Sequence, residues 1–177
     1  MIVVVTGPIA SGKSTIAIEL ARQLSLNDVR AEVIDLDLVY DGLIAQGLPP
    51  DASTWRRARG DAARTTDAFL DDDVAVIVAE GSFNLPDDRS AFVDQLRSNS
   101  EVVFVTLRVS FEEALRRAQG DQTRGRSRDP EFLGAHFAER RDLMAAVPET
   151  DIVIDTEQVS AATAAASIAR LIGQPRP

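Results

Sequence analysis

The chain has 177 residues, a length typical of one domain, and we expect a single domain over residues 1–177. Its 45% hydrophobic and 27% charged residues exclude a disordered chain, and the lack of cysteine excludes a disulfide framework, a thiolate metal site and a cysteine nucleophile. The 19 basic and 28 acidic residues give a formal net charge of −9, which opposes binding to the phosphates of DNA or RNA, so no nucleic-acid partner is expected.

Short β-branched runs alternate with longer helical patterns along the chain. We expect strands at 2–6, 31–35, 74–79, 101–108 and 151–155, and helices at 14–24, 38–46, 51–70, 87–98, 110–118 and 161–172. Strands that are apolar throughout and alternate with helices predict an α/β fold, in which a five-stranded, mostly parallel sheet is covered by helices on both faces. In such sheets, ligands bind at the carboxyl ends of the strands.

Residues 7–14 match the pattern G-x-x-x-x-G-K-[ST] between the first expected strand and the first expected helix. The glycines let backbone N–H groups turn toward phosphate oxygens, and the start of the helix adds its positive dipole end. Lys13, the only lysine of the chain, is expected to reach the β- and γ-phosphates, while the Ser14 hydroxyl holds Mg²⁺. The predicted ATP-binding residues of this loop are Gly7, Ile9, Ala10, Ser11, Gly12, Lys13, Ser14 and Thr15.

Carboxylates follow two of the expected strands. Asp37 is placed to orient an acceptor hydroxyl and to accept its proton, as phosphoryl transfer requires. The alternative is that Asp37 only caps a helix starting at Leu38. Asp35 and Glu80 are predicted Mg²⁺ ligands, and Glu80 is also placed to contact an acceptor hydroxyl; the alternative for Glu80 is an ordinary acid that faces water.

A polar, glycine-punctuated segment at about 119–130 lies between two expected helices and carries three arginines in alternation, Arg124, Arg126 and Arg128. A planar guanidinium suits the charge that develops on a transferring phosphoryl group. We therefore interpret the segment as a mobile lid that closes over the site and excludes water. The alternative is a solvated loop.

With these features the chain resembles the small P-loop kinases, the group that includes shikimate kinases, adenylylsulfate kinases, chloramphenicol phosphotransferases and zeta-toxin-like kinases. Residues 34–43, Ile-Asp-Leu-Asp-Leu-Val-Tyr-Asp-Gly-Leu, are similar to a segment of adenylylsulfate kinases. The pair Trp55-Arg56 is similar to the Phe-Arg pair that positions substrate in shikimate kinases, and residues 140–144 and 153–156 are similar to later segments of that family. Arg117 and Arg124 keep the spacing of its lid arginines.

The resemblance implies that Arg117 stacks on adenine, that Arg124 contacts the phosphates and that Thr156 lines the base. Arg56, Phe83 and Arg140 are the corresponding candidate acceptor contacts. Shikimate kinases carry three glycines where this chain has Glu80-Gly81-Ser82, whereas uridine kinases and zeta-like kinases carry Glu-Gly there, so an acidic acceptor is disfavoured at this position.

We therefore expect an ATP- and Mg²⁺-dependent phosphotransferase that acts on a hydroxyl of a small molecule. The alternatives are an ATP-binding or ATP-hydrolysing regulatory module without an acceptor and, within the kinases, an antibiotic-modifying enzyme or a metabolic or nucleoside kinase. No run approaches the roughly 18 apolar residues that span a membrane, and residues 1–6 are too few for a signal-peptide core. We expect a cytoplasmic protein without a membrane partner, and the sequence does not indicate its oligomeric state.

Overall fold

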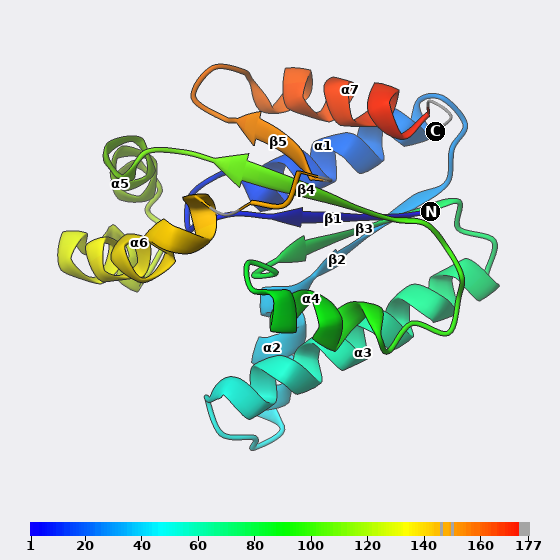
Figure 1. Cartoon of the computed structure of the whole chain (residues 1–177), viewed down its shortest axis with the longest axis horizontal. Helices are drawn as coiled ribbons and strands as arrows, with labels where there is room; N and C mark the ends of the chain where they lie inside the picture. Colours follow the sequence, from blue (N-terminus) through cyan, green and yellow to red (C-terminus); the bar gives the residue numbers. More distant parts are fainter. Residues whose placement is uncertain (146, 150, 174–177) are drawn as a thin grey trace.

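The computed structural model describes residues 1–145, 147–149 and 151–173, with the side chains of 140 and 142–145 left out of the description. Its sheet is entirely parallel, with the strand order β2-β3-β1-β4-β5 (Figure 1). The strands are β1 (Ile2–Thr6), β2 (Ala31–Asp35), β3 (Val76–Gly81), β4 (Val102–Arg108) and β5 (Ile152–Asp155). The predicted α/β class and the five-stranded parallel sheet are therefore confirmed.

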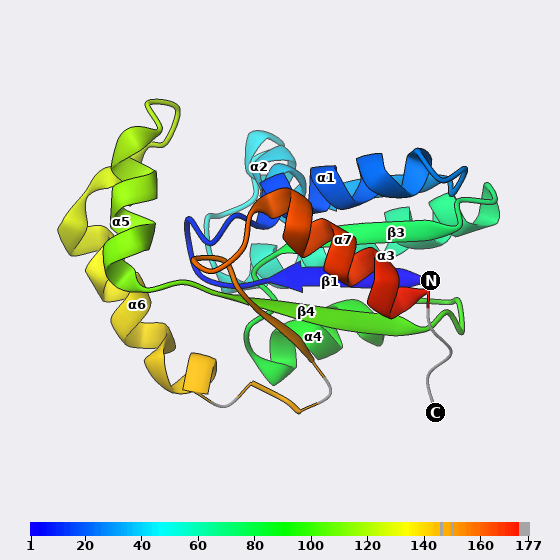
Figure 2. The same ribbon diagram turned by 90° about the horizontal axis from the view of Figure 1, so that it is seen from above.

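Helices cover both faces of this sheet. Helices α1 (Lys13–Ser25) and α7 (Ala161–Ile172) pack on each other over one face. The other face is covered by α3 (Ala52–Asp71) and α4 (Pro86–Val93), with α2 (Leu36–Ala45) packed beside α3. Helices α5 (Phe111–Gly120) and α6 (Pro130–Ala145), joined through the short 3₁₀ helix η1 (Arg126–Arg128), lie together beyond one end of the sheet (Figures 1 and 2).

The apolar strands are explained by burial on both faces. In β1, Val3 and Val5 pack into the cluster under α1 and α7, whereas Ile2 and Val4 pack into the cluster under α3 and α4. All four side chains have no exposed surface. Full burial of one such side chain stabilises a fold by about 2 kcal/mol. The central strand is therefore firmly held in the core, and it fixes the position of the loop that begins at its end.

The register of the sheet brings its carboxyl ends to one level. Thr6, the last residue of β1, lies opposite Gly81 of β3, and Asp35, the last residue of β2, lies opposite Glu80. β3 ends two residues later than the sequence pattern predicts, so Glu80 and Gly81 belong to the strand itself. The two carboxylates therefore stand on adjacent strands at the edge of the sheet where ligands bind.

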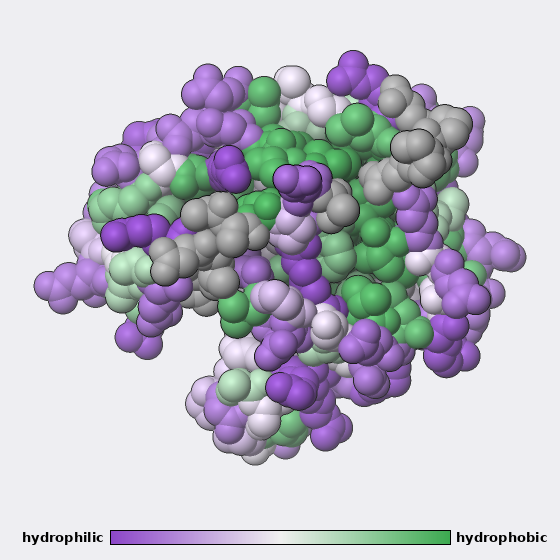
Figure 3. Space-filling view, in the orientation of Figure 1, coloured by the Kyte–Doolittle hydropathy of each residue, from purple (hydrophilic) through white to green (hydrophobic). Residues whose placement is uncertain are grey.

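The surface has an open hollow at this end of the molecule, between the part formed by α5 and α6 and the part formed by α2 and the start of α3 (Figure 3). Among the helices that the structure describes, none is both long enough and apolar enough to cross a membrane.

Candidate active site

The loop between β1 and α1 has the backbone of a phosphate-binding loop. Gly7, Ala10 and Gly12 have positive φ angles of 151°, 61° and 93°. At Gly7 only glycine fits, because a Cβ atom would lie 2.8 Å from the carbonyl oxygen of Leu107. The N-cap of α1 is Gly12, so the first N–H groups of the helix remain available to an anion.

A cavity of about 270 Å³ opens in front of this loop, and we call it the phosphate-loop cavity. The side chain of Lys13 folds back over the loop, and its Nζ donates hydrogen bonds to the carbonyl oxygens of Gly7 and Pro8, each at 3.2 Å. Ser11, a residue of the loop itself, is fully buried. The cavity is lined by Ile9, Ala10, Gly12, Lys13, Ser14, Thr15, Asp37, Arg124 and Ser127.

Asp35 and Asp37 have different roles at the start of α2. The helix begins at Leu36, two residues earlier than expected, and its N-cap is Asp35. The Asp35 Oδ1 accepts hydrogen bonds from the N–H groups of Asp37 at 2.9 Å and Leu38 at 3.2 Å. The alternative in which Asp37 caps the helix is therefore wrong, and the Asp37 carboxylate lines the phosphate-loop cavity.

The surroundings of Asp37 favour its protonated form more than water does. Crowding by protein atoms in the cavity raises its pKa, and the negative charges of Asp35 and Asp41 act in the same direction. The positive charge of Lys13 opposes this effect. A carboxylate whose pKa is raised toward neutral pH is a better proton acceptor than an ordinary surface aspartate.

Glu80 lies near the carboxyl end of β3 and is buried, with 3% of its surface exposed. Burial raises its pKa to about 7, and a hydrogen bond from the Ser14 hydroxyl partly opposes that shift. Asp35 on the neighbouring strand raises the pKa further, whereas Lys13 lowers it. Glu80 and Ser14 are thus held together beneath the phosphate loop.

The oxygen donors at this point fit Mg²⁺, which prefers hydroxyl, carboxylate and phosphate oxygens. The raised pKa of Glu80 indicates a buried carboxylate whose charge a cation would stabilise. Within the described residues, no group of three or more histidine, cysteine or acidic side chains gathers at a distance that could hold a metal alone. Ser14, Asp35 and Glu80 would therefore hold the ion together with oxygens of a bound nucleotide.

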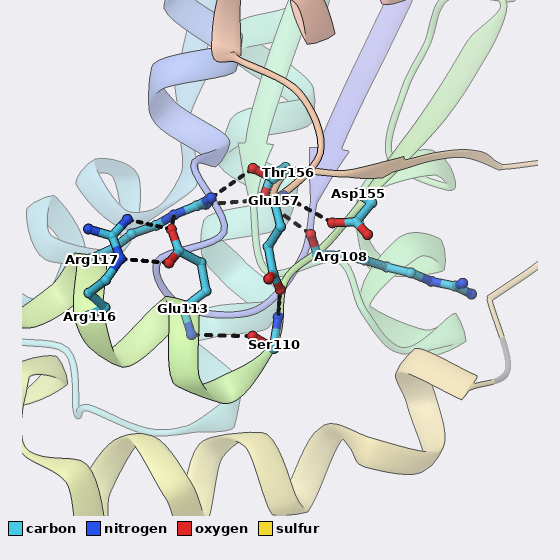
Figure 4. A network of polar contacts seen from close by, with 8 residues as sticks. All are labelled: Arg108, Ser110, Glu113, Arg116, Arg117, Asp155, Thr156 and Glu157. Atoms are coloured by element: carbon cyan, nitrogen blue, oxygen red, sulfur yellow. Dashed lines mark hydrogen bonds and ion pairs between the residues drawn. The ribbon is translucent and has the colours of Figure 1, made fainter.

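Arg117 joins α5 to the segment after β5. It donates from Nη1 to the Oγ1 of Thr156 at 3.0 Å and from Nη2 to the carbonyl oxygen of Thr156 at 2.7 Å (Figure 4). On its other side it donates from Nε to Glu113, which also pairs with Arg116. The hydrogen bonds from Arg116 and Arg117 lower the pKa of Glu113 to about 2, so this network stays charged at neutral pH.

The segment that the sequence predicts as a lid does reach the phosphate loop. Arg124 and Ser127 from this segment line the same cavity as Lys13 and Asp37. The Nε of Arg124 donates to the Oδ2 of Asp121 at 3.2 Å, a pair that is partly exposed on both sides. Arg124 therefore stands where its charge adds to that of Lys13 at the mouth of the loop.

Of the three predicted acceptor contacts, Arg56 and Phe83 are not among the residues that line the phosphate-loop cavity. Arg56 is exposed and lines a groove between α3 and α4, away from the phosphate-loop cavity. Phe83 has no exposed surface and packs edge-to-face on Phe92 in the core, so its side chain is closed to a ligand. Arg140 belongs to α6, but its side chain lies outside the described part of the chain.

Arg59, which the sequence did not single out, is the buried arginine near Arg56 on α3. It is only 6% exposed, it donates from Nη2 to the carbonyl oxygen of Ser82 at 2.8 Å, and it pairs with Asp88 at 2.9 Å. Burial lowers its pKa, an effect that Asp88 opposes. The signal in the sequence was its spacing from Ala58, Ala62 and Ala63, which mark the buried face of α3.

The contact between α2 and α3 includes an aromatic stack. The rings of Tyr40 in α2 and Trp55 in α3 stack with their centroids 3.8 Å apart.

Comparison with known proteins agrees with this geometry. Residues 2–147 match the family described as AAA domain. No curated protein sequence matches the chain significantly. Among solved structures, a sugar kinase from Janibacter sp. HTCC2649 is similar with a TM-score of 0.70 and 23% identity, covering 97% of this chain and 93% of that one.

Two further solved structures show the same fold. The tunicamycin resistance protein of Deinococcus radiodurans has a TM-score of 0.68 and 18% identity, covering 99% of this chain and 98% of that one. The APS kinase of Mycobacterium tuberculosis, solved in complex with AMPPNP and APS, has a TM-score of 0.66 and 19% identity, covering 98% and 97%. At these identities the likeness establishes the fold that the chain shares with P-loop kinases.

Proposed function

The chain belongs to the AAA domain family, and on that premise we propose that it is a phosphotransferase that moves the γ-phosphate of ATP–Mg²⁺ to a hydroxyl of a small molecule. The observation that carries this proposal is the phosphate-loop cavity. Lys13, Asp37 and Arg124 come from three separate segments and line this one space. A carboxylate whose pKa is raised, in the same space as the phosphate-binding lysine, suits an acceptor hydroxyl that must lose a proton, and for this reason we favour transfer over an ATP-hydrolysing module.

The nucleotide end of the proposed site is formed by the loop and by the Arg117 network. The β- and γ-phosphates would lie against the N–H groups at the start of α1, with Lys13 beside them. The base would lie near Arg117 and Thr156, which already contact each other. Mg²⁺, held by Ser14, Asp35 and Glu80, would supply positive charge that neutralises the charge developing on the phosphates.

The chemistry of transfer falls to Asp37 and the cationic side chains. The acceptor hydroxyl oxygen forms a bond to the γ-phosphorus as the bond from that phosphorus to the ADP oxygen breaks. Asp37, with its raised pKa, receives the hydroxyl proton. Lys13 and Arg124 stabilise the negative charge spread over the transferring group, and a closed lid keeps water from competing as the acceptor.

We propose the acceptor as a class, a small molecule with a hydroxyl group. The solved structures of similar fold are described as a sugar kinase, a tunicamycin resistance protein and an APS kinase, and the two kinases among them support a small-molecule acceptor. Arg59, which donates to the carbonyl oxygen of Ser82 just after β3, is neutralised by its pairing with Asp88, and Glu80 adds a buried carboxylate at the end of the same strand. This arrangement favours an acceptor that is neutral near that strand end.

The proposal is tested by a mass-shift screen of hydroxylated small molecules with ATP and Mg²⁺. The panel contains sugars, sugar acids, nucleosides, shikimate, adenylylsulfate, and amphenicol, aminoglycoside and nucleoside antibiotics. One compound should gain about 80 Da, the mass of one phosphoryl group. Asp37→Asn should lower kcat on the order of 10²- to 10⁴-fold while the affinity for ATP changes little.

The matched control is Asp41→Asn, because Asp41 lies on the same helix, is exposed, and does not line the phosphate-loop cavity. It should retain transfer, since it removes the same charge without removing the proton acceptor. Equal losses in the two variants would mean that net charge, and not the position of Asp37, matters. Rapid ATP hydrolysis that no acceptor stimulates would support the regulatory module instead.

A further inference from the structure

The phosphate loop is attached to the lid helices by a third apolar cluster, separate from the two clusters that sandwich the sheet. Its buried members are Ala10 of the loop, Ala114 and Ala118 of α5 and Leu133 of α6. Ile9, Val109, Phe111, Leu115 and Phe137 pack around them. The wall of the phosphate-loop cavity formed by Ile9 and Ala10 therefore rests directly on α5 and α6.

A hydrogen bond runs alongside this apolar contact. The Nε2 of His136 in α6 accepts from the backbone N–H of Ile9 at 3.2 Å. A ring nitrogen accepts a hydrogen bond only when it carries no proton, so this contact requires the neutral imidazole with its proton on Nδ1. The N–H of Ile9 is thereby directed toward α6, and the orientation of its peptide plane is set by a residue on a distant segment.

Ile9 lies in the first half of the loop, before Gly12 and the start of α1. In such loops, backbone N–H groups of the loop and of the first helical turn are directed at nucleotide phosphates, but the N–H of Ile9 is directed at His136. Ile9 and Ala10 form the part of the cavity wall that precedes α1 in the chain, in the space shared with Asp37 and Arg124. A change in the peptide plane of Ile9 would therefore alter the cavity where the γ-phosphate and the acceptor meet more than it would alter nucleotide binding.

We propose that His136 is a positioning residue for phosphoryl transfer, acting through the N–H of Ile9. This inference rests on the proposed function. His136 holds the loop at Ile9 against α6, the helix that directly follows the lid residues Arg124 and Ser127. The contact therefore fixes the position of the phosphate loop relative to the lid. Displacing reacting groups by about 1 Å can lower a rate on the order of 100-fold, so a single such contact is enough to matter.

Two substitutions of His136 by amide side chains distinguish a hydrogen-bonding role from a packing role, because only one of them can reach the N–H of Ile9. In His136→Gln, the longer side chain can bring its Oε1 to the place of Nε2 and accept from Ile9 again. In His136→Asn, the amide stops near the place of Nδ1 and cannot reach. Ala135→Asn is the matched control, because it puts the same asparagine on the exposed side of the same helix.

The first readout does not depend on activity. Exchange of the Ile9 amide hydrogen, followed by NMR in the full chain, should be about tenfold faster in His136→Asn than in the wild type and nearly unchanged in His136→Gln and Ala135→Asn. In kinetics, His136→Asn should lower kcat about tenfold with KM for ATP within about twofold, and His136→Gln should restore most of kcat.

Ile9 exchange that is the same in all variants would overturn the inference, as would a kcat for His136→Asn equal to that of Ala135→Asn. A rise in KM for ATP without a fall in kcat would also overturn it, because His136 would then act on nucleotide binding. If the wild type transfers no phosphoryl group to any compound, the proposed function fails, and Ile9 exchange together with basal ATP hydrolysis still decides the role of His136.

Discussion

The carboxylate of Asp35 accepts a hydrogen bond from the backbone N–H of Asp37 at 2.9 Å. The first of two neighbouring acids therefore caps α2 and fixes the first turn of the helix, and the second is left to line the phosphate-loop cavity. The two acids thus differ in their contacts, because only Asp35 orders the backbone of α2 and only Asp37 lines the phosphate-loop cavity.

Lys13→Ala should abolish phosphoryl transfer with little effect on folding. The Nζ of Lys13 donates to two carbonyl oxygens of its own loop, so its loss removes charge at the cavity without opening the core. We expect kcat to fall on the order of 10²- to 10³-fold. Thermal unfolding checks that the fold is intact, and turnover equal to that of the wild type would rule out the phosphate-loop assignment.

Glu80→Gln should remove a pH dependence of stability. Burial raises the pKa of Glu80 from 4.5 to about 7. Between these two pH values the unfolded chain loses a proton that the folded chain retains, so the free energy of unfolding falls as pH rises through this window and levels off above about pH 7. The loss amounts to at most about 3 kcal/mol.

Urea unfolding of the wild type and Glu80→Gln at several pH values isolates this contribution, because the other titrating groups are common to both proteins. The stability of Glu80→Gln relative to the wild type should rise from pH 4.5 to pH 7. A constant difference across that range would mean that Glu80 is ionised in the folded protein throughout.

Arg117→Ala should weaken ATP binding, whereas Arg116→Ala should not. Both arginines donate to Glu113, but only Arg117 also donates to Thr156 in the described network (Figure 4). We expect the Kd for ATP to rise about tenfold in Arg117→Ala, measured by calorimetry without an acceptor. If the two variants bind ATP equally well, the link from α5 to Thr156 has no part in the nucleotide site.

Gly7→Ala should destabilise the protein, whereas Gly120→Ala should not. A Cβ at Gly7 would lie 2.8 Å from the carbonyl oxygen of Leu107, and the φ angle of 151° is unfavourable for any other residue. At Gly120, no atom lies within 4 Å of the added Cβ. We expect a loss of about 2 kcal/mol or more in Gly7→Ala, measured by chemical unfolding. Equal stabilities would mean that the loop relaxes without cost.

Local patterns in the sequence were sufficient for much of this site. The phosphate loop is a continuous motif whose glycines require particular φ angles, and the runs of β-branched residues indicate buried parallel strands. Both signals arise from neighbours along the chain. The positions of Asp37 and Glu80 near the loop also followed, because parallel strands end at one edge of the sheet.

Rotation of each helix about its axis was decided by tertiary packing. Arg56 and Arg59 are less than one turn apart on α3, and only the contact of that helix with the sheet places Arg56 outside and Arg59 against Ser82. Phe83 likewise follows a strand that carries site residues, yet it turns into the core to meet Phe92. A sequence motif specifies residue types, but it does not specify the rotation of a helix about its axis or the direction in which a side chain points.

The sequence by itself thus determined the fold class, the phosphate loop and the acids at the strand ends, since each depends on hydrogen bonding and periodicity over a few residues. Only the tertiary structure decided which of two acids caps α2, which arginine of α3 turns inward, and that His136 reaches Ile9. These contacts join segments whose relative placement follows from the packing of whole helices on the sheet, which no local pattern encodes.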